Sequence, residues 1–293
     1  MFSLIEFLLI GAPYIDELPI GAKRAYKITQ ILPILIQPVK DIAQRLYKSI
    51  QKESNLGILT GFPIQGTFET DGPLGAFILG DFLASRRIQV NLILESPLKQ
   101  KIQQLPWNNS ARNYIKFTSI SQLDKIPPVM ISIEYPGQNI KGICHNMKGY
   151  PLSQHIFDIE SMIDSEPPKY WLGIGDGGNE LGLGKIRSRI IKVIKFGKSC
   201  RCECGGGIAA FRSSNEFLLG ITSNLASLII TYELSILFGE TLKYSWKKET
   251  QLLARLNSLG IIDGITGKFG TVDSIPPQLA KKIIGSIIQH YSI

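Results

Sequence analysis

The feature that most constrains the fold of this chain is the alternation of short apolar runs with longer segments of helical periodicity. Short apolar runs bounded by glycine, proline or polar residues are typical of buried strands. Strands separated by helices pair as parallel neighbours in a sheet that helices cover on both faces. We therefore predict an α/β fold with a mostly parallel sheet. The predicted strands cover residues 56–62, 88–94, 114–118, 129–133, 170–174 and 217–221.

Helical periodicity predicts helices over residues 73–85, 152–163, 224–237, 246–259 and 276–291, and a further helix that follows Glu180 and stops at Gly197. Pro33 and Pro38 divide residues 23–53 into two helical pieces, because proline interrupts a helix. We expect one α/β domain over residues 1–293, with residues 1–55 as a helical N-terminal segment packed on it.

The composition, with 44% apolar and 19% charged residues, is that of a folded globular protein. No stretch reaches the ~20 apolar residues that a membrane-spanning helix needs. Residues 1–10 lack the basic N-terminal residues of a signal peptide, and they include the acidic Glu6. Both observations favour a core helix or strand over a signal peptide. Four cysteines are too few for a disulfide scaffold and favour a reducing compartment. We therefore expect a cytoplasmic protein without a membrane partner.

Three of the cysteines alternate as Cys200, Cys202 and Cys204. In a strand they would point to one face. Their spacing differs from that of a zinc knuckle, and fewer than four metal ligands are evident. We interpret them as core residues, with a metal site as the alternative.

The net charge of +8 is concentrated in a basic stretch, residues 185–201, which contains seven lysines and arginines and no acidic residue. In a helix, one face would carry the apolar residues Ile186, Ile190, Val193 and Ile194. The charged side chains would lie on the remaining faces. We interpret this stretch as a solvated helix surface, with an anion or nucleic-acid patch as the alternative. A nucleic-acid partner is not expected.

Polar residues that could carry chemistry follow the predicted strands, where ligands bind in parallel sheets. The first loop contains Thr60 and Gly61, and ends in Glu69-Thr70-Asp71-Gly72 before a helix. A helix N-terminus offers free N–H groups to an anion. Thr70 or Asp71 acting as a simple helix cap is the alternative.

Other loops give weaker signals. Glu134 directly follows an apolar run, where a glutamate can be an acid, a base or a ligand. His145 and Asn146 follow, and a lone histidine is a weak catalytic signal. Ser223-Asn224 and Asp263-Gly264 are each interpreted first as a cap or a turn.

The densest signal is the acidic, glycine-rich loop over residues 173–180. Its glycines, among them Gly175, Gly177 and Gly178, exceed what one turn requires. Its three oxygen-bearing side chains belong to Asp176, Asn179 and Glu180. Hard cations such as Mg²⁺ or Mn²⁺ take such ligands, and a substrate ammonium group also fits. Asp176 and Glu180 are therefore candidate ligands of a divalent cation, and an ordinary turn is the alternative.

The order of these loops resembles the D-glutamate cyclase family over residues 56–273. The most specific parts are Thr-Asp-Gly-Pro-Leu-Gly at 70–75 and Gly-Asp-Gly-Gly-Asn-Glu-x-Gly-x-Gly at 175–184. This chain departs from the family pattern at His145, where tyrosine is expected, and at Leu183, where methionine is expected. It also departs in residues 200–211, where three glycines are inserted.

The resemblance implies a hydro-lyase of D-amino acid metabolism that converts D-glutamate to 5-oxo-D-proline and water. It implies catalytic roles for five carboxylates, those of Glu69, Asp71, Glu134, Asp176 and Glu180. Asp176 and Glu180 are assigned to metal or ammonium binding, and Glu134 or Glu69 to proton transfer. The residues expected to bind the amino-acid substrate are Thr60, Gly61, Thr70, Gly72, Asn146, Gly177, Gly178, Asn179, Ser223, Asn224 and Asp263.

Two other functions remain open from the sequence. A metal-dependent phosphohydrolase of the haloacid dehalogenase type has a similar Gly-Asp-Gly motif, but it also needs Asp-x-Asp after its first strand. No Asp-x-Asp occurs in this chain. A non-catalytic module for an amino acid or a nucleotide would use the acidic loop to hold its ligand without turnover. The sequence does not indicate an oligomeric state.

Overall fold

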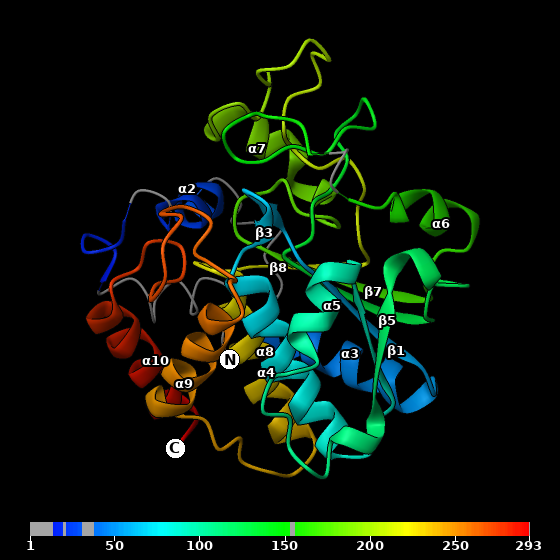
Figure 1. Ribbon diagram of the computed structural model, residues 1–293, viewed down its shortest axis with the longest axis vertical. Coiled ribbons are helices and arrows are strands. Elements are labelled where there is room, and N and C mark those ends of the chain that lie inside the picture. Colours follow the sequence, from blue (N-terminus) through cyan, green and yellow to red (C-terminus); the bar gives the residue numbers. More distant parts are fainter. Residues whose placement is uncertain (1–13, 20–21, 31–37, 153–155, 293) are drawn as a thin grey trace.

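The computed structural model describes residues 14–19, 22–30, 38–152 and 156–292, and the expectation for residues 1–10 lies outside these ranges. Six parallel strands form one sheet in the order β5-β4-β1-β6-β7-β8, which confirms the α/β prediction (Figure 1). The strands are β1 (Leu56–Thr60), β4 (Val90–Leu94), β5 (Ile115–Ser119), β6 (Val129–Ile133), β7 (Tyr170–Gly175) and β8 (Glu216–Leu219).

The strand order fixes where a ligand can bind. The chain builds β4 and β5 on one side of β1, then returns to build β6, β7 and β8 on the other side. The loops after β1 and β6 therefore diverge, and such a switch point opens a crevice at the carboxyl ends of the strands. The loop after β1 also carries a hairpin of β2 (Pro63–Ile64) and β3 (Thr67–Phe68). Its turn residues Gln65 and Gly66 have φ of 41° and 80°, as a tight two-residue hairpin turn requires.

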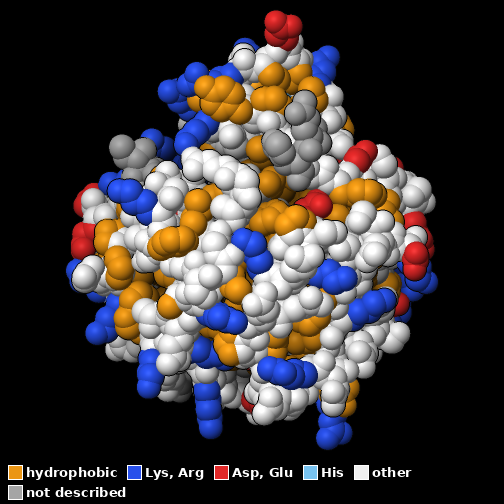
Figure 2. Space-filling view, viewed as in Figure 1, with side chains coloured by type: hydrophobic (Ala, Val, Ile, Leu, Met, Phe, Trp, Pro, Cys, Tyr) orange, Lys and Arg blue, Asp and Glu red, His pale blue; other side chains and the backbone are white. Residues whose placement is uncertain are grey.

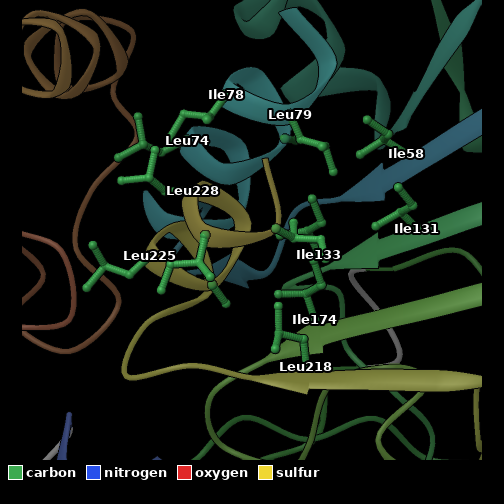
Figure 3. Packing of buried hydrophobic residues seen from close by; sticks show 14 of the residues in the cluster. Ile58, Leu74, Ile78, Leu79, Ile131, Ile133, Ile174, Leu218, Leu225 and Leu228 are labelled. Atoms are coloured by element: carbon green, nitrogen blue, oxygen red, sulfur yellow. The ribbon is translucent and has the colours of Figure 1, made fainter. Parts of the chain in front are cut away.

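Large helices cover one face of the sheet. They are α3 (Val39–Lys52), α4 (Asp71–Ser85) and α8 (Ser223–Leu237), and α4 packs directly against α8. Figure 3 shows leucines of α4 and α8 meeting isoleucines of β1, β6 and β7 in this layer. The sheet residues on this face include Ile58, Leu92, Ile131 and Leu172.

A separate hydrophobic cluster covers the opposite face. It contains the alternate strand residues Leu59, Ile93, Met130 and Trp171, together with Ile159 and Ile163 of α6 (Ile159–Ser165). Side chains alternate between the faces along each strand, and both faces are buried. This two-sided burial explains why the strands are continuous apolar runs rather than alternating ones.

The remaining helices are α2 (Lys23–Gln30), α5 (Ser96–Ile102), α7 (Arg187–Val193), α9 (Trp246–Ser258) and α10 (Pro277–Tyr291). The two helical pieces predicted within residues 23–53 are confirmed as α2 and α3. Within the described residues, no helix is both long enough and apolar enough to cross a membrane.

Two predicted helices are shorter than expected. The helix predicted over 152–163 begins only at Ile159, because Asp158 caps it by accepting a hydrogen bond from the Ser161 N–H. The helix predicted to stop at Gly197 ends at Val193, because Ile194 adopts an extended backbone with ψ of 130°. The residue with positive φ in this turn is Phe196, at 67°, rather than Gly197.

The basic stretch behaves as a helix surface over its helical part. Ile186, Ile190 and Ile194 are buried, whereas Val193 is half-buried and Lys192 is exposed. Lysine and arginine side chains lie on the upper part of the molecule, where α7 is, and also across the lower part of the same face (Figures 1 and 2).

Candidate active site

A cavity of about 730 Å³ opens at the carboxyl ends of β1, β6 and β7. Hairpin β2–β3, residues 146–152 and the loop after β7 form its walls. The polar and charged side chains that line it include Arg24, Glu69, Glu134, Asp176 and Asn179. The cavity therefore lies where the strand order predicts a crevice.

Carboxylates from distant parts of the chain meet beside this cavity in three overlapping triads. Within each triad, oxygen atoms of the three side chains lie within 4.8 Å of one another. The triads are Glu69–Asp71–Glu134, Glu134–Asp176–Glu180 and Asp71–Asp176–Asp273. The structure thus brings together the five carboxylates that sequence analysis selected and adds Asp273. We call these six residues the carboxylate cluster.

Burial strengthens proton binding by five carboxylates of the cluster, those of Glu69, Asp71, Glu134, Asp176 and Asp273. It raises the pKa of Asp71 to about 8, and repulsion from Asp176 adds to this effect, while nearby backbone N–H groups oppose it. It raises the pKa of Asp273 to about 7, against the opposing effect of Asp176. Burial, followed by repulsion from other carboxylates, also raises the pKa of Glu69, Glu134 and Asp176 well above the usual range. Carboxylates this close cannot all ionise, so they share protons.

Arg24 of α2 supplies a positive charge at the cluster. Its Nη2 lies 3.5 Å from Oδ1 of Asp176 and 3.9 Å from Oδ2 of Asp273. Burial lowers the pKa of the guanidinium, but attraction to Asp176 and Asp273 outweighs burial and raises it, so Arg24 stays charged. Sequence analysis missed both Arg24 and Asp273. Arg24 lies 152 positions from Asp176, and neither residue follows a predicted strand.

Glu180 organises the acidic loop from within. Its carboxylate accepts hydrogen bonds from the backbone N–H groups of Asp176 (3.3 Å), Gly177 (2.7 Å) and Gly178 (2.6 Å). A Cβ on Gly175 would lie 2.7 Å from the Glu180 carboxyl carbon, so a side chain there would displace the glutamate. The loop therefore needs its glycines to close around its own carboxylate.

Glu134 has a strained backbone, with φ of 46° in a buried position. Strain of this kind persists only where the surrounding structure enforces it. Its carboxylate accepts a hydrogen bond from the Ser223 hydroxyl at the start of α8. A Cβ on Gly72 would lie 2.8 Å from Glu134 Cβ and 2.7 Å from Thr60 Oγ1, so this glycine lets α4 approach both residues.

Several buried polar atoms around the cluster make no well-formed hydrogen bond within the described chain. They are Oγ1 of Thr60, both carboxylate oxygens of Asp71, Oδ1 of Asn179 and Oδ2 of Asp273, the last of which lies 3.9 Å from Nη2 of Arg24. Buried polar groups are nearly always paired, so a concentration of unpaired ones marks a place for a polar ligand or for water.

The first loop and residue 146 are shaped by backbone contacts. Gly61 has φ of 123°, which a residue with a side chain rarely adopts. Thr70 occupies the N-cap position of α4 without a side-chain cap bond, so Thr70 does not act as the simple helix cap. Asn146 lines the cavity, and its Oδ1 accepts the backbone N–H groups of Lys148 and Tyr150, both at 3.0 Å.

Two of the predicted substrate-binding residues are directed into contacts of the protein itself. Asp263 accepts the backbone N–H groups of Ile265 (2.8 Å) and Ser274 (2.7 Å), and so shapes the loop that carries Asp273. Asn224 donates to Oε1 of Glu249 at 2.9 Å. Of the predicted substrate-binding residues, Asn146 and Asn179 line the cavity, whereas the others do not: Thr60, Gly61, Thr70, Gly72, Gly177, Gly178, Ser223, Asn224 and Asp263.

The cysteine run differs from the sequence interpretation. Cys200, Cys202 and Cys204 lie in irregular turns, not in a strand, and all three are half-buried. Their sulfur atoms converge with His145, and one ligand atom from each of the four residues lies within 4.8 Å of the others. Cys200 packs against the edge of the hydrophobic core, whereas Cys202 and Cys204 are not part of it, so the core-packing interpretation holds only for Cys200.

The raised pKa of Asp71 gives a testable pH dependence of stability. The folded value of about 8 exceeds the ordinary value of 3.8, so the folded protein binds this proton more tightly than the unfolded chain. The stabilisation is complete below about pH 4 and is lost as the pH rises towards 8. For protein dialysed free of substrate and added divalent cations, we expect the melting temperature to fall between about pH 6 and pH 8. Asp71→Asn should flatten this fall, and parallel melting curves for the two proteins would contradict the assignment.

Comparison with known proteins adds an independent observation. Residues 37–288 match the family described as "D-glutamate cyclase-like, C-terminal". The chain is also similar to a human (Homo sapiens) protein, "D-glutamate cyclase, mitochondrial", with 25% identity over 191 residues. This alignment covers 56% of the present chain and 31% of the human protein, so it spans just under a third of that relative's length.

Proposed function

Because this chain belongs to the D-glutamate cyclase-like family, we propose that it is a hydro-lyase that converts D-glutamate into 5-oxo-D-proline and water. The observation that carries the proposal is a group of carboxylates with raised pKa values, among them Asp71 and Asp273, beside a cavity large enough for an amino acid. An enzyme that moves protons at neutral pH needs acids tuned to that range.

The reaction is a transfer of protons within one molecule. The α-ammonium group loses two protons as its nitrogen forms the amide bond to the γ-carboxyl carbon. The γ-carboxylate loses one oxygen, which leaves as water after it gains two protons. The cyclisation neither consumes nor releases a net proton. Carboxylates that share protons can therefore accept two protons from the substrate nitrogen and donate two protons to the departing oxygen. A site that holds the α-nitrogen close to the γ-carboxyl carbon also accelerates closure of the five-membered ring.

The positions of the residues suggest separate roles. Asp176 lines the cavity, and its carboxyl group would ionise and pair with the substrate ammonium group. Glu134 and Glu69 also line the cavity and would transfer the protons. Ser223 positions Glu134 through its hydroxyl hydrogen bond, and Glu180 holds the loop that carries Asp176.

The donor set also fits a hard divalent cation such as Mg²⁺ or Mn²⁺. Asp176 is common to two triads, and one of them contains Asp71 and Asp273, which have carboxylate oxygens without a well-formed hydrogen bond. Glu180 already accepts three backbone N–H groups, so Asp71, Asp176 and Asp273 fit a cation better than Asp176 and Glu180 do. A bound cation would supply Lewis-acid polarisation of the γ-carboxylate.

The direct test is to incubate the protein with D-glutamate, with and without added Mg²⁺ or Mn²⁺, and to resolve 5-oxoproline by chiral chromatography. We expect 5-oxo-D-proline to form, with L-glutamate as the stereochemical control. Tight binding of D-glutamate without product would instead support a binding module. Hydrolysis of a phosphate ester without cyclisation would support a phosphohydrolase, although β1 ends at Thr60 and is followed by Gly61-Phe62-Pro63 rather than by an aspartate.

A further inference from the structure

Two unusual parts of the sequence meet outside the carboxylate cluster. His145 precedes the wall segment 146–150, and the Cys200–Cys204 run precedes the three glycines at 205–207. In the structure Nε2 of His145 lies 3.1 Å from Sγ of Cys202 and 3.9 Å from Sγ of Cys204. Sγ of Cys200 lies 3.3 Å from that of Cys202 and 3.2 Å from that of Cys204.

From this convergence we propose that His145, Cys200, Cys202 and Cys204 form a tetrahedral site for a structural zinc ion. Zinc binds thiolate sulfur at about 2.3 Å and imidazole nitrogen at about 2.0–2.1 Å. A tetrahedral set then has S···S spacings of about 3.8 Å and N···S spacings of about 3.5 Å. The measured spacings agree to within about 0.6 Å, whereas a disulfide requires sulfur atoms about 2.05 Å apart.

Neighbouring groups prepare two of the four side chains, those of His145 and Cys204, as ligands. Nδ1 of His145 lies 3.0 Å from the carbonyl oxygen of Ile143, and only a protonated nitrogen can pair with a carbonyl. The proton is therefore on Nδ1, and the lone pair of Nε2 faces the sulfur atoms, as in most histidines that bind zinc. The backbone N–H of Gly206 (3.4 Å) and the side-chain amide of Asn139 (3.5 Å) donate to Sγ of Cys204.

The site would fasten one wall of the cavity to the rest of the protein. The carbonyl oxygen of His145 accepts a hydrogen bond from Nδ2 of Asn179 at 2.9 Å, which connects it to the acidic loop. The backbone N–H of Arg201 donates to the carbonyl oxygen of Gly149 at 2.9 Å. A metal bound between these segments would hold both connections. It would have no open position for substrate, as is usual for zinc sites with four protein ligands.

The test is to purify the full chain under reducing conditions and to measure zinc by mass spectrometry. We expect about one zinc per chain, and Co²⁺ in its place should give the ligand-field and thiolate charge-transfer absorption of a tetrahedral sulfur-rich site. Cys202→Ser should lose the metal. The matched control is Cys144→Ser, which removes the remaining cysteine next to His145 but no ligand, and it should keep the metal.

Two further measurements keep the outcome clear if Cys202→Ser folds poorly. Adding zinc to metal-free wild-type protein should raise its melting temperature by on the order of 5 °C or more. Asp176→Asn, which alters the carboxylate cluster, should retain stoichiometric zinc. A wild-type protein that stays metal-free in excess zinc, or that contains a disulfide under reducing conditions, would overturn the proposal. So would zinc that is lost from Asp176→Asn but kept by Cys202→Ser. None of these results depends on cyclase activity.

Discussion

Replacing Asp176 by asparagine is expected to lower the turnover of D-glutamate by on the order of 10³-fold. Asp176 lines the cavity, belongs to two of the three carboxylate triads and pairs with Arg24 at 3.5 Å. The substitution keeps the shape of the side chain but removes the carboxyl group, which would ionise on pairing with the substrate ammonium group. The measurement is the initial rate of 5-oxo-D-proline formation over a range of substrate concentrations and pH.

This loss should not result from unfolding. Burial raises the pKa of Asp176 well above the usual range, so the folded protein already favours its uncharged form. Asparagine resembles that form, and the melting temperature of the variant should equal or exceed that of the wild type at neutral pH. The matched control is Asp81→Asn, a buried aspartate ten positions beyond Asp71 on α4, where it accepts the Asn108 N–H at 2.7 Å. An Asp176→Asn variant within about tenfold of wild-type activity would contradict the assignment.

Replacing Gly178 by alanine is expected to lower the free energy of unfolding by about 3–5 kcal/mol. Gly178 has φ of 88°, where a side chain is strained, and its added Cβ would lie 2.2 Å from Cδ1 of Ile190. Ile190 is fully buried under the acidic loop, so it cannot move aside without disturbing the packing of α7. Urea unfolding followed by circular dichroism measures the change.

Gly270→Ala provides the matched control for the steric part of this effect. Gly270 has almost the same φ, 89°, but nothing lies within 4 Å of its added Cβ. Its replacement should cost only the backbone strain, about 1–2 kcal/mol. Equal losses for the two variants would show that the contact with Ile190 contributes nothing, whereas a larger loss for Gly178→Ala supports the close packing described above.

Much of the fold follows from local sequence. Strands buried on both faces must be continuous apolar runs, so β6 and β7 could be recognised from residues 129–133 and 170–174 alone. Helix ends were harder to predict, because they depend on single capping contacts such as that of Asp158 with Ser161. The loops after the strands were also predictable as candidate site loops, since parallel strands bring their carboxyl ends to one edge of the sheet.

The sequence by itself therefore determined the parallel α/β sheet and the order of its acidic, glycine-rich loops. Only the tertiary structure decided which other side chains join them. Arg24 and Asp176 are 152 positions apart, and His145 and Cys202 are 57 positions apart. Local periodicity records which face of a strand or helix is buried, but it carries no information on which distant segments meet. Which segments meet depends on how the helices and loops pack on the sheet. This packing brings the alternating cysteines Cys200, Cys202 and Cys204 together with His145.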